Sequence, residues 1–149
     1  MSDLDELYQQ IIVEHNRSPR NFKRIDDATR TAEGDNPLCG DKITLYVKLA
    51  GDVISDIGFE GKGCAISKSS ASLMTGAVKG KKVAEAERLF HEFRDMVAGE
   101  HPIADPTSLG KLAAFAGVRQ FPSRIKCANL AWHTLHAALA GAAESVTTE

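Results

Sequence analysis

A chain of 149 residues is long enough for one domain with a hydrophobic core and short for two. A formal net charge of −2, without a basic stripe, argues against a nucleic-acid partner, and no apolar run approaches the roughly 20 residues that span a bilayer. The acidic segment at residues 3–6 does not resemble a secretory signal, so we expect a cytoplasmic protein.

The first part of the chain predicts a short helix followed by a long arm. Apolar residues recur at helical spacing over residues 4–12, and Pro19 marks the end of this helix. Residues 17–34 are polar and aperiodic, which indicates an extended arm that Phe22 docks onto the rest of the protein. Residues 30–34 are a candidate edge strand within this segment.

Two alternating segments predict an antiparallel hairpin. Over residues 43–49 apolar side chains alternate with polar ones, and the same period of two continues over residues 53–59. Residues 50–52 have the composition of a turn between them. Each strand is therefore expected to bury one face.

The remainder of the chain predicts helices. Helical spacing with glycine and proline boundaries places them at residues 65–78, 82–98, 107–117 and 122–139. Thr107 or Ser108 would cap the third helix, residues 101–106 would form a loop, and the tail from residue 141 would fray. The expected fold is α+β: a single domain over residues 1–149, with a small antiparallel sheet of about three strands covered by helices.

Three cysteines lie far apart in the sequence: Cys39, Cys64 and Cys127. In a reducing compartment such cysteines are buried apolar residues, metal ligands or reactive thiols more often than disulfides. Cys39 precedes the first hairpin strand and Cys64 follows the second, and these two positions meet at the same end of a hairpin. Cys127, in about the first turn of the last helix, joins them if that helix begins at the same end. Helix N-termini are also expected to lower the thiol pKa of Cys64 and of Cys127.

Asp41 is the candidate fourth ligand. Residues two apart in an extended chain project to the same side, so Cys39 and Asp41 can face one centre. The alternative is that the Asp41 carboxylate makes a local hydrogen bond in the turn before the strand. Spacing alone leaves both interpretations open.

A donor set of three thiolates and one carboxylate suits zinc or iron–sulfur chemistry. Four protein ligands leave no position for a water, so hydrolytic zinc chemistry is not expected; the site would be structural or would carry a displaceable thiolate. The ligands bear four negative charges against two on the metal, which nearby cations would offset. Arg124, one helical turn before Cys127, is the strongest candidate. Lys126 is also close in sequence, whereas Lys62 is interpreted first as an ordinary surface cation. The histidines are interpreted as surface or packed residues.

Four segments of the chain resemble one superfamily. They are N-P-L-C-G-D at residues 36–41, G-K-G-C-A-I-S at 61–67, I-K-C at 125–127 and R-S-P-R-N at 17–21. They resemble the NifU N-terminal and IscU-like proteins of iron–sulfur cluster assembly, over nearly the whole chain. The SufU branch is favoured, because assembly scaffolds usually carry a histidine where this chain has Lys126, and residues 100–120 look like the SufU insertion. The Leu-Pro-Pro-Val-Lys segment by which scaffolds engage their chaperone is absent.

The resemblance implies a zinc-dependent sulfurtransferase. Such a protein accepts persulfide sulfur from a SufS-type cysteine desulfurase, a pyridoxal-phosphate enzyme, and relays it to a downstream SUF assembly scaffold. By position, Cys39, Asp41, Cys64 and Cys127 would bind zinc. Cys39 would be the catalytic sulfur acceptor, freed when a desulfurase histidine takes its place on the metal, and Arg124 would support the exchange.

Two other functions use the same residues. In the first, the protein is a scaffold that assembles and transfers a 2Fe–2S cluster on the same four ligands. In the second, the zinc is purely structural and the function lies on another surface. Lys126 and the insertion argue against the scaffold.

Overall fold

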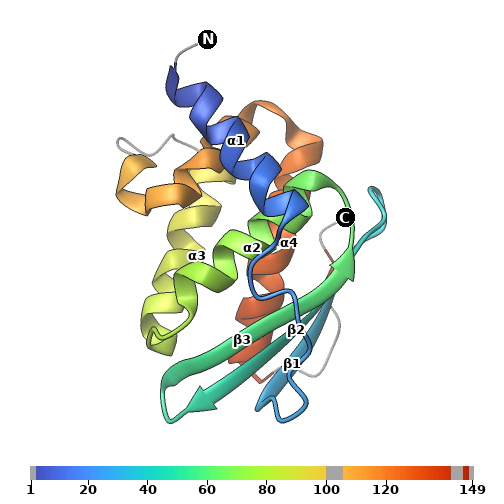
Figure 1. The fold of residues 1–149 in the computed structure, drawn as a ribbon, viewed down its shortest axis with the longest axis vertical. Helices are drawn as coiled ribbons and strands as arrows, with labels where there is room; N and C mark the ends of the chain where they lie inside the picture. The colour runs from blue at the N-terminus through green and yellow to red at the C-terminus, as the bar shows by residue number, and fades with distance from the viewer. Residues whose placement is uncertain (1–2, 100–105, 142–145, 148–149) are drawn as a thin grey trace.

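The computed structural model describes residues 3–99, 106–141 and 146–147. Its elements are, in chain order, α1 (Asp3–Arg17), β1 (Arg30–Asn36), β2 (Asp41–Ala50), β3 (Val53–Lys62), α2 (Ala65–Val78), α3 (Val83–Ala98), the 3-10 helix η1 (Pro106–Gln120), α4 (Pro122–Leu139) and β4 (Val146–Thr147). Figure 1 shows the helices gathered against one face of a curved sheet, which confirms the α+β prediction. Among the described residues, no helix combines the length and apolarity that a bilayer crossing needs.

The sheet has the strand order β3-β2-β1-β4. The pairs β1–β2 and β2–β3 are both antiparallel, so the predicted hairpin is confirmed and a strand is present at residues 30–34. The prediction that this strand lies at the edge is wrong, because β1 lies between β2 and β4. The prediction of a wholly frayed tail is wrong, because β4 pairs in parallel with β1 opposite Gly34 and Asp35. The sequence signal was too short to find a strand of two residues.

The core lies between the inner face of the sheet and helices α2, α3 and α4. Leu45 and Val47 of β2 alternate with less buried residues and point into it. Trp132 of α4 stacks on Phe93 of α3 with ring centroids 4.9 Å apart. Gly34 lets α4 approach β1 closely, because a Cβ at this position would overlap Oγ1 of Thr134. This close packing fixes α4, which carries Cys127, against the strand that leads to Cys39.

The segment before α4 differs from the helix predicted at residues 107–117. It forms 3-10 turns over Pro106–Gln120, and Gly110 interrupts them with a left-handed φ of 62°. Glycine adopts this backbone at little cost, so the helical pattern breaks there. The loop predicted at residues 101–106 lies almost wholly outside the described residues, as do the side chains of Thr107 and Ser108 that were expected to cap the helix.

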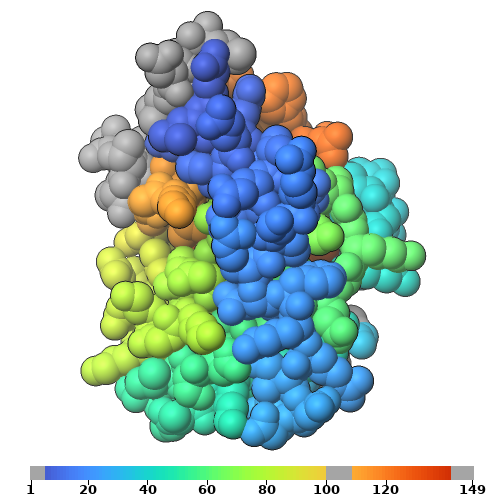
Figure 2. Space-filling model, in the orientation of Figure 1, coloured from blue at the N-terminus to red at the C-terminus, as the bar shows by residue number. Residues whose placement is uncertain are grey.

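The arm between α1 and β1 is docked, as predicted. Phe22 packs edge-on against Phe59 of β3, with ring centroids 5.1 Å apart. The Asn21 carbonyl accepts a hydrogen bond from the Phe59 amide (3.0 Å), and the Asn21 side chain donates to Thr75 Oγ1 of α2 (3.1 Å). Gly58 provides the room, because a Cβ there would overlap the Lys23 carbonyl. Figure 2 shows this segment as a continuous blue band that runs from α1 across α2 to the sheet.

The buried His15 ties α1 to α2. Its Nδ1 lies 2.7 Å from Ser72 Oγ, which also accepts the Arg20 amide at 2.7 Å. Burial lowers the pKa of His15 below its ordinary value of 6.5, and the positive charges of Arg20 and Lys111 lower it further, against the opposing charge of Glu14. The folded protein therefore holds His15 in its neutral form.

We expect His15 to make the protein less stable in acid. Because its folded-state pKa is depressed, the stability that neutral His15 contributes is present above about pH 6.5 and is lost as the pH falls below that value. Replacing His15 by glutamine should reduce the loss of unfolding free energy between about pH 8 and about pH 5. The remaining pH dependence would include His133, whose pKa burial also lowers. Denaturant titrations at several pH values measure this, with the exposed His91→Gln as the matched control; an unchanged slope in His15→Gln would contradict the prediction.

Candidate metal centre

All four predicted ligands lie at one end of the sheet. Cys39 lies in the turn between β1 and β2, and Asp41 is the first residue of β2. Cys64 is the N-cap of α2, and Cys127 lies in the second turn of α4. Figure 1 shows the β1–β2 turn, the end of β3 and the starts of α2 and α4 on the same side of the molecule. This arrangement agrees with the prediction that the hairpin brings Cys39 and Cys64 to the same end of the sheet. It also meets the condition set for Cys127, because the last helix begins at that end.

Three of the four side chains are already within ligand distance. Single ligand atoms of Cys39, Asp41 and Cys127 all lie within 4.8 Å of one another. Cys64 is not part of that close group, although its Sγ lies 4.0 Å from Asp41 Oδ2. Zinc–sulfur bonds of about 2.3 Å place tetrahedral ligand atoms about 3.8 Å apart. The donor set therefore fits a tetrahedral thiolate-binding metal with small side-chain movements, one of them at Cys64.

The orientation of Asp41 bears on the two interpretations left open by its spacing. Asp41 is fully buried and pairs with Asn36 across β1 and β2 on the inner face of the sheet. Its Oδ1 accepts the backbone amide of Cys64 at 2.8 Å, 23 residues away, instead of a neighbouring turn amide. Gly63 permits this contact, since a Cβ there would overlap the Asp41 carboxylate. The carboxylate therefore joins the hairpin to the start of α2 and faces the thiols.

The Cys64 side chain caps α2. Its Sγ accepts the Ser67 amide at 3.4 Å, in the position that a serine or aspartate side chain usually takes at a helix N-terminus. A thiolate at this position gains from the positive end of the helix. A metal ligand here would therefore be held by the helix backbone.

The prediction that the helix N-terminus lowers the pKa of the Cys127 thiol is wrong. Burial raises the pKa of Cys127 far above its ordinary value, and hydrogen bonding to Asp41, Cys39 and Cys64 raises it further. The effect of a helix terminus falls off within the first turn, whereas Cys127 is one turn deeper and fully buried. The Cys127 thiol therefore keeps its proton until a metal cation displaces it.

Arg124 is at the site, as predicted. It lies in the first turn of α4 with an exposed side chain. The negative charge of Cys64 raises the pKa of Arg124, a hydrogen bond to Cys127 adds to this, and Cys39 contributes a smaller effect. The positive charge of Arg124 therefore interacts favourably with the cysteine cluster.

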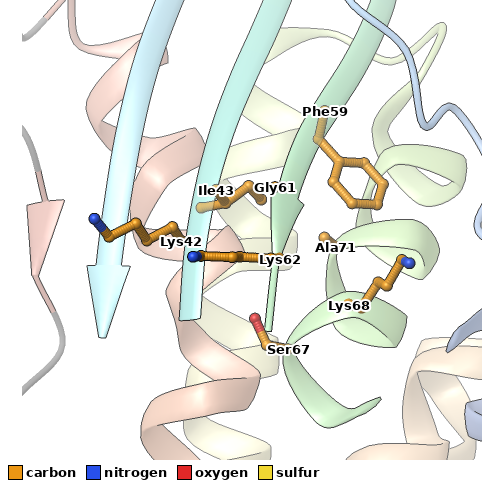
Figure 3. A pocket seen from close by; sticks show the side chains of 8 residues that line it. All are labelled: Lys42, Ile43, Phe59, Gly61, Lys62, Ser67, Lys68 and Ala71. Carbon is orange, nitrogen blue, oxygen red and sulfur yellow. The ribbon is translucent and has the colours of Figure 1, made fainter. Parts of the chain in front are cut away.

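The two lysines predicted beside the site are placed differently. Lys126 is half-buried on α4 next to Cys127. Lys62 pairs with Lys42 across β3 and β2, and Figure 3 shows both side chains extending to the same side of the hairpin. Both residues are exposed, whereas Asp41 next to Lys42 is buried on the inner face. Lys62 is therefore a surface cation and not part of the ligand cluster.

Asn36 is a site residue that the sequence analysis did not single out. It is fully buried, and its Nδ2 lies 3.4 Å from Asp41 Oδ2 and 3.6 Å from Cys127 Sγ. The available signal was its place at the start of the N-P-L-C-G-D segment, three residues before Cys39. Its contact with Cys127 depends on the packing of α4 against β1, which local sequence does not reveal.

Residues 7–128 match the family described as NifU-like N terminal domain, and the chain belongs to this family. It is 44% identical over 139 residues to the zinc-dependent sulfurtransferase SufU of Bacillus subtilis (strain 168), and the match covers 93% of each chain. It is 42% identical over 139 residues to the iron–sulfur cluster assembly scaffold protein IscU of Streptococcus pyogenes serotype M1, covering 93% of this chain and 86% of the relative.

Solved structures agree with this assignment. A structure from Fervidobacterium islandicum AW-1, described as a scaffold protein for iron–sulfur cluster assembly in the SUF system, is 36% identical. It aligns with a TM-score of 0.82 and covers 90% of this chain and 97% of its own. The N-terminal part of a NifU-like protein from Brucella abortus has the same TM-score at 22% identity and 94% coverage of this chain, which shows the shared fold.

Proposed function

We propose that this protein is a zinc-dependent sulfurtransferase of the SufU type, which accepts persulfide sulfur from a SufS-type cysteine desulfurase and relays it for iron–sulfur cluster assembly. The observation that carries the proposal is the convergence of Cys39 with Asp41 and Cys127, and of Asp41 with Cys64, at one end of the sheet. The 44% identity to a relative named as a zinc-dependent sulfurtransferase supports it.

In this proposal Cys39, Asp41, Cys64 and Cys127 hold the zinc. A bound zinc ion keeps the thiols deprotonated at neutral pH, including that of Cys127, whose burial otherwise favours the protonated form. Cys127 and Asp41 are fully buried, and Cys64 is held by the start of α2. Cys39 is half-buried on a turn, so it is the ligand with most freedom to leave.

The transfer step uses the Cys39 thiolate as the nucleophile. It attacks the terminal sulfur of the persulfide on the donor enzyme, a new sulfur–sulfur bond forms on Cys39, and the donor's own sulfur–sulfur bond breaks. The donor cysteine leaves as a thiolate, so atoms and electrons balance without an added oxidant. Arg124, whose positive charge interacts favourably with the cysteine cluster, would stabilise the anionic sulfur before and after transfer. A downstream SUF assembly scaffold would take the sulfur from Cys39 by the same kind of exchange.

The second candidate function is a scaffold on which a 2Fe–2S cluster is assembled and passed on. It is favoured by the 42% identity to the Streptococcus pyogenes relative, which is named as such a scaffold. The same thiolates and carboxylate could ligate iron. Anaerobic reconstitution distinguishes the two functions, because only the scaffold should form a stable coloured cluster that transfers to an apo-protein.

The direct test combines metal analysis with mapping of the transferred sulfur. Freshly purified protein should contain about one zinc per chain, as four ligands in one closed site imply. After incubation with a cysteine desulfurase and cysteine, mass spectrometry should find one additional sulfur on the peptide that contains Cys39. Additional sulfur on Cys64 or Cys127 alone, or none on any cysteine, would refute the relay.

A further inference from the structure

Asn36 contacts three of the four proposed ligands. Its backbone carbonyl accepts the amide of Cys39 at 3.2 Å and so forms the turn that carries this thiol. Its side-chain Nδ2 donates to Asp41 Oδ2 at 3.4 Å and to Cys127 Sγ at 3.6 Å. One fully buried residue at the end of β1 thus connects the turn, the start of β2 and α4.

The orientation of the Asn36 amide follows from the charges that it faces. Its Oδ1 is buried without a hydrogen-bond partner, which lowers the stability of the folded protein. The opposite orientation would aim this oxygen at the Asp41 carboxylate and the Cys127 sulfur, both anionic when a metal is bound. The observed orientation instead presents two N–H groups to the two ligands, and such hydrogen bonds to charged acceptors are the strong ones.

The four ligands therefore differ in how they are held. The Asp41 carboxylate accepts the Cys64 amide on one oxygen and Asn36 on the other. Sγ of Cys64 accepts the Ser67 amide, and Sγ of Cys127 accepts Asn36. Over the parts of the chain that the structure describes, no backbone or amide N–H donates to Cys39 Sγ. Three ligands thus accept an amide N–H, whereas Cys39 is held by the turn and by its contact with the Cys127 thiol.

We propose that Asn36 is a positioning residue that keeps Cys127 and Asp41 in the ligand set, so that Cys39 is the ligand released for reaction. This inference rests on the proposed function, because it assumes a metal on these four side chains. Groups that orient metal ligands through hydrogen bonds typically contribute about 10–100-fold to metal affinity. Asn36 also sets the order of release, because its side-chain N–H groups donate to Cys127 and Asp41 and not to the Cys39 sulfur.

Zinc affinity tests the first part of this proposal. In competition with a chromogenic chelator, Asn36→Ala should weaken zinc binding by about 10–100-fold. Asn36→Asp keeps the side-chain volume but turns a donor toward two anions into a third anion, so it should weaken binding further. Asn129→Ala is the matched control, since Asn129 is a buried amide on α4 without a hydrogen bond to the four ligands, and it should bind zinc as the wild type does.

Alkylation tests the order of release. In the zinc-loaded wild type, iodoacetamide should modify Cys39 well before Cys127, as followed by peptide mass spectrometry. In Asn36→Ala the ratio of the two rates should fall toward equal reactivity. Circular dichroism and metal-free unfolding report whether each variant folds, and the nearly isosteric Asn36→Asp carries the test if Asn36→Ala does not.

Unchanged zinc affinity and an unchanged alkylation order in both Asn36 variants would overturn the role of Asn36. Failure of the proposed function has a different signature: the wild type itself would lack tight zinc binding, or its most reactive thiol would not be Cys39. Both measurements are made without the desulfurase, so neither depends on activity.

Discussion

Replacing Cys39 by alanine is expected to abolish sulfur acceptance from a cysteine desulfurase and to leave the fold intact. The relay needs a thiolate that forms a new sulfur–sulfur bond, and alanine offers no nucleophile. The structural cost should be small, because Cys39 lies half-buried in a turn and its thiol is not part of the hydrophobic core. The rate at which the desulfurase releases sulfur from cysteine, with and without this protein, measures the effect.

The expected rate with Cys39→Ala is that of the desulfurase alone. Cys39→Ser separates loss of the nucleophile from loss of side-chain volume, since a hydroxyl group cannot carry the sulfur, and it should fail equally. Denaturant unfolding of the metal-free variants should match the wild type within about 0.5 kcal/mol, the usual range for surface substitutions. Full acceleration of the desulfurase by Cys39→Ala would show that the acceptor is another residue.

Lys126 bears on the choice between relay and scaffold. A lysine ammonium group only donates hydrogen bonds, so this position cannot supply a nitrogen ligand to a metal or cluster while it is charged. A histidine at the same position could ligate. The proposed ligand set is therefore three thiolates and one carboxylate, which would be complete for one zinc ion.

The period-two pattern of the hairpin predicted that Cys39 and Cys64 lie close together. Alternation over residues 43–49 and 53–59 defines two antiparallel strands, and antiparallel strands bring Cys39 and Cys64 to the same end without any tertiary information. The same pattern predicts which face of β2 is buried. This is why the ligands could be proposed from sequence although they lie far apart along the chain.

The features that were missed depend on packing between distant segments. The raised pKa of Cys127 comes from burial among other ligands, and a helix position alone predicts the opposite shift. The contact of Asn36 with Cys127 requires α4 to lie against β1 at Gly34. The β4 pairing joins residues more than a hundred positions apart through only two residue pairs. None of these has a periodic or local sequence signal.

Gly63→Ala should displace Asp41 and weaken zinc binding, although it replaces none of the proposed ligands. A Cβ at this position would overlap Asp41 Oδ1 and lie 3.0 Å from Cγ and 3.2 Å from Cα of the same residue. The metal-free protein can relieve the overlap by rotating the Asp41 side chain away from Cys64. The metal-bound protein must keep the carboxylate in place, so the strain falls on the bound state. Overpacking of this kind costs about 1–3 kcal/mol, which corresponds to roughly 5- to 150-fold in affinity.

Gly76→Ala is the matched control, because it is the same chemical change in α2 and, apart from the adjacent backbone of the helix itself, no heavy atom lies within 4 Å of the added Cβ. Alanine in a helix interior is favoured over glycine by about 0.5–1 kcal/mol, so this variant should be at least as stable as the wild type and should bind zinc equally well. Zinc affinities of the two variants, measured by chelator competition, therefore distinguish displacement of the Asp41 carboxylate from a general effect of replacing glycine by alanine. Wild-type zinc affinity in Gly63→Ala would mean that the Asp41 carboxylate is not a ligand, and that three thiolates alone define the centre.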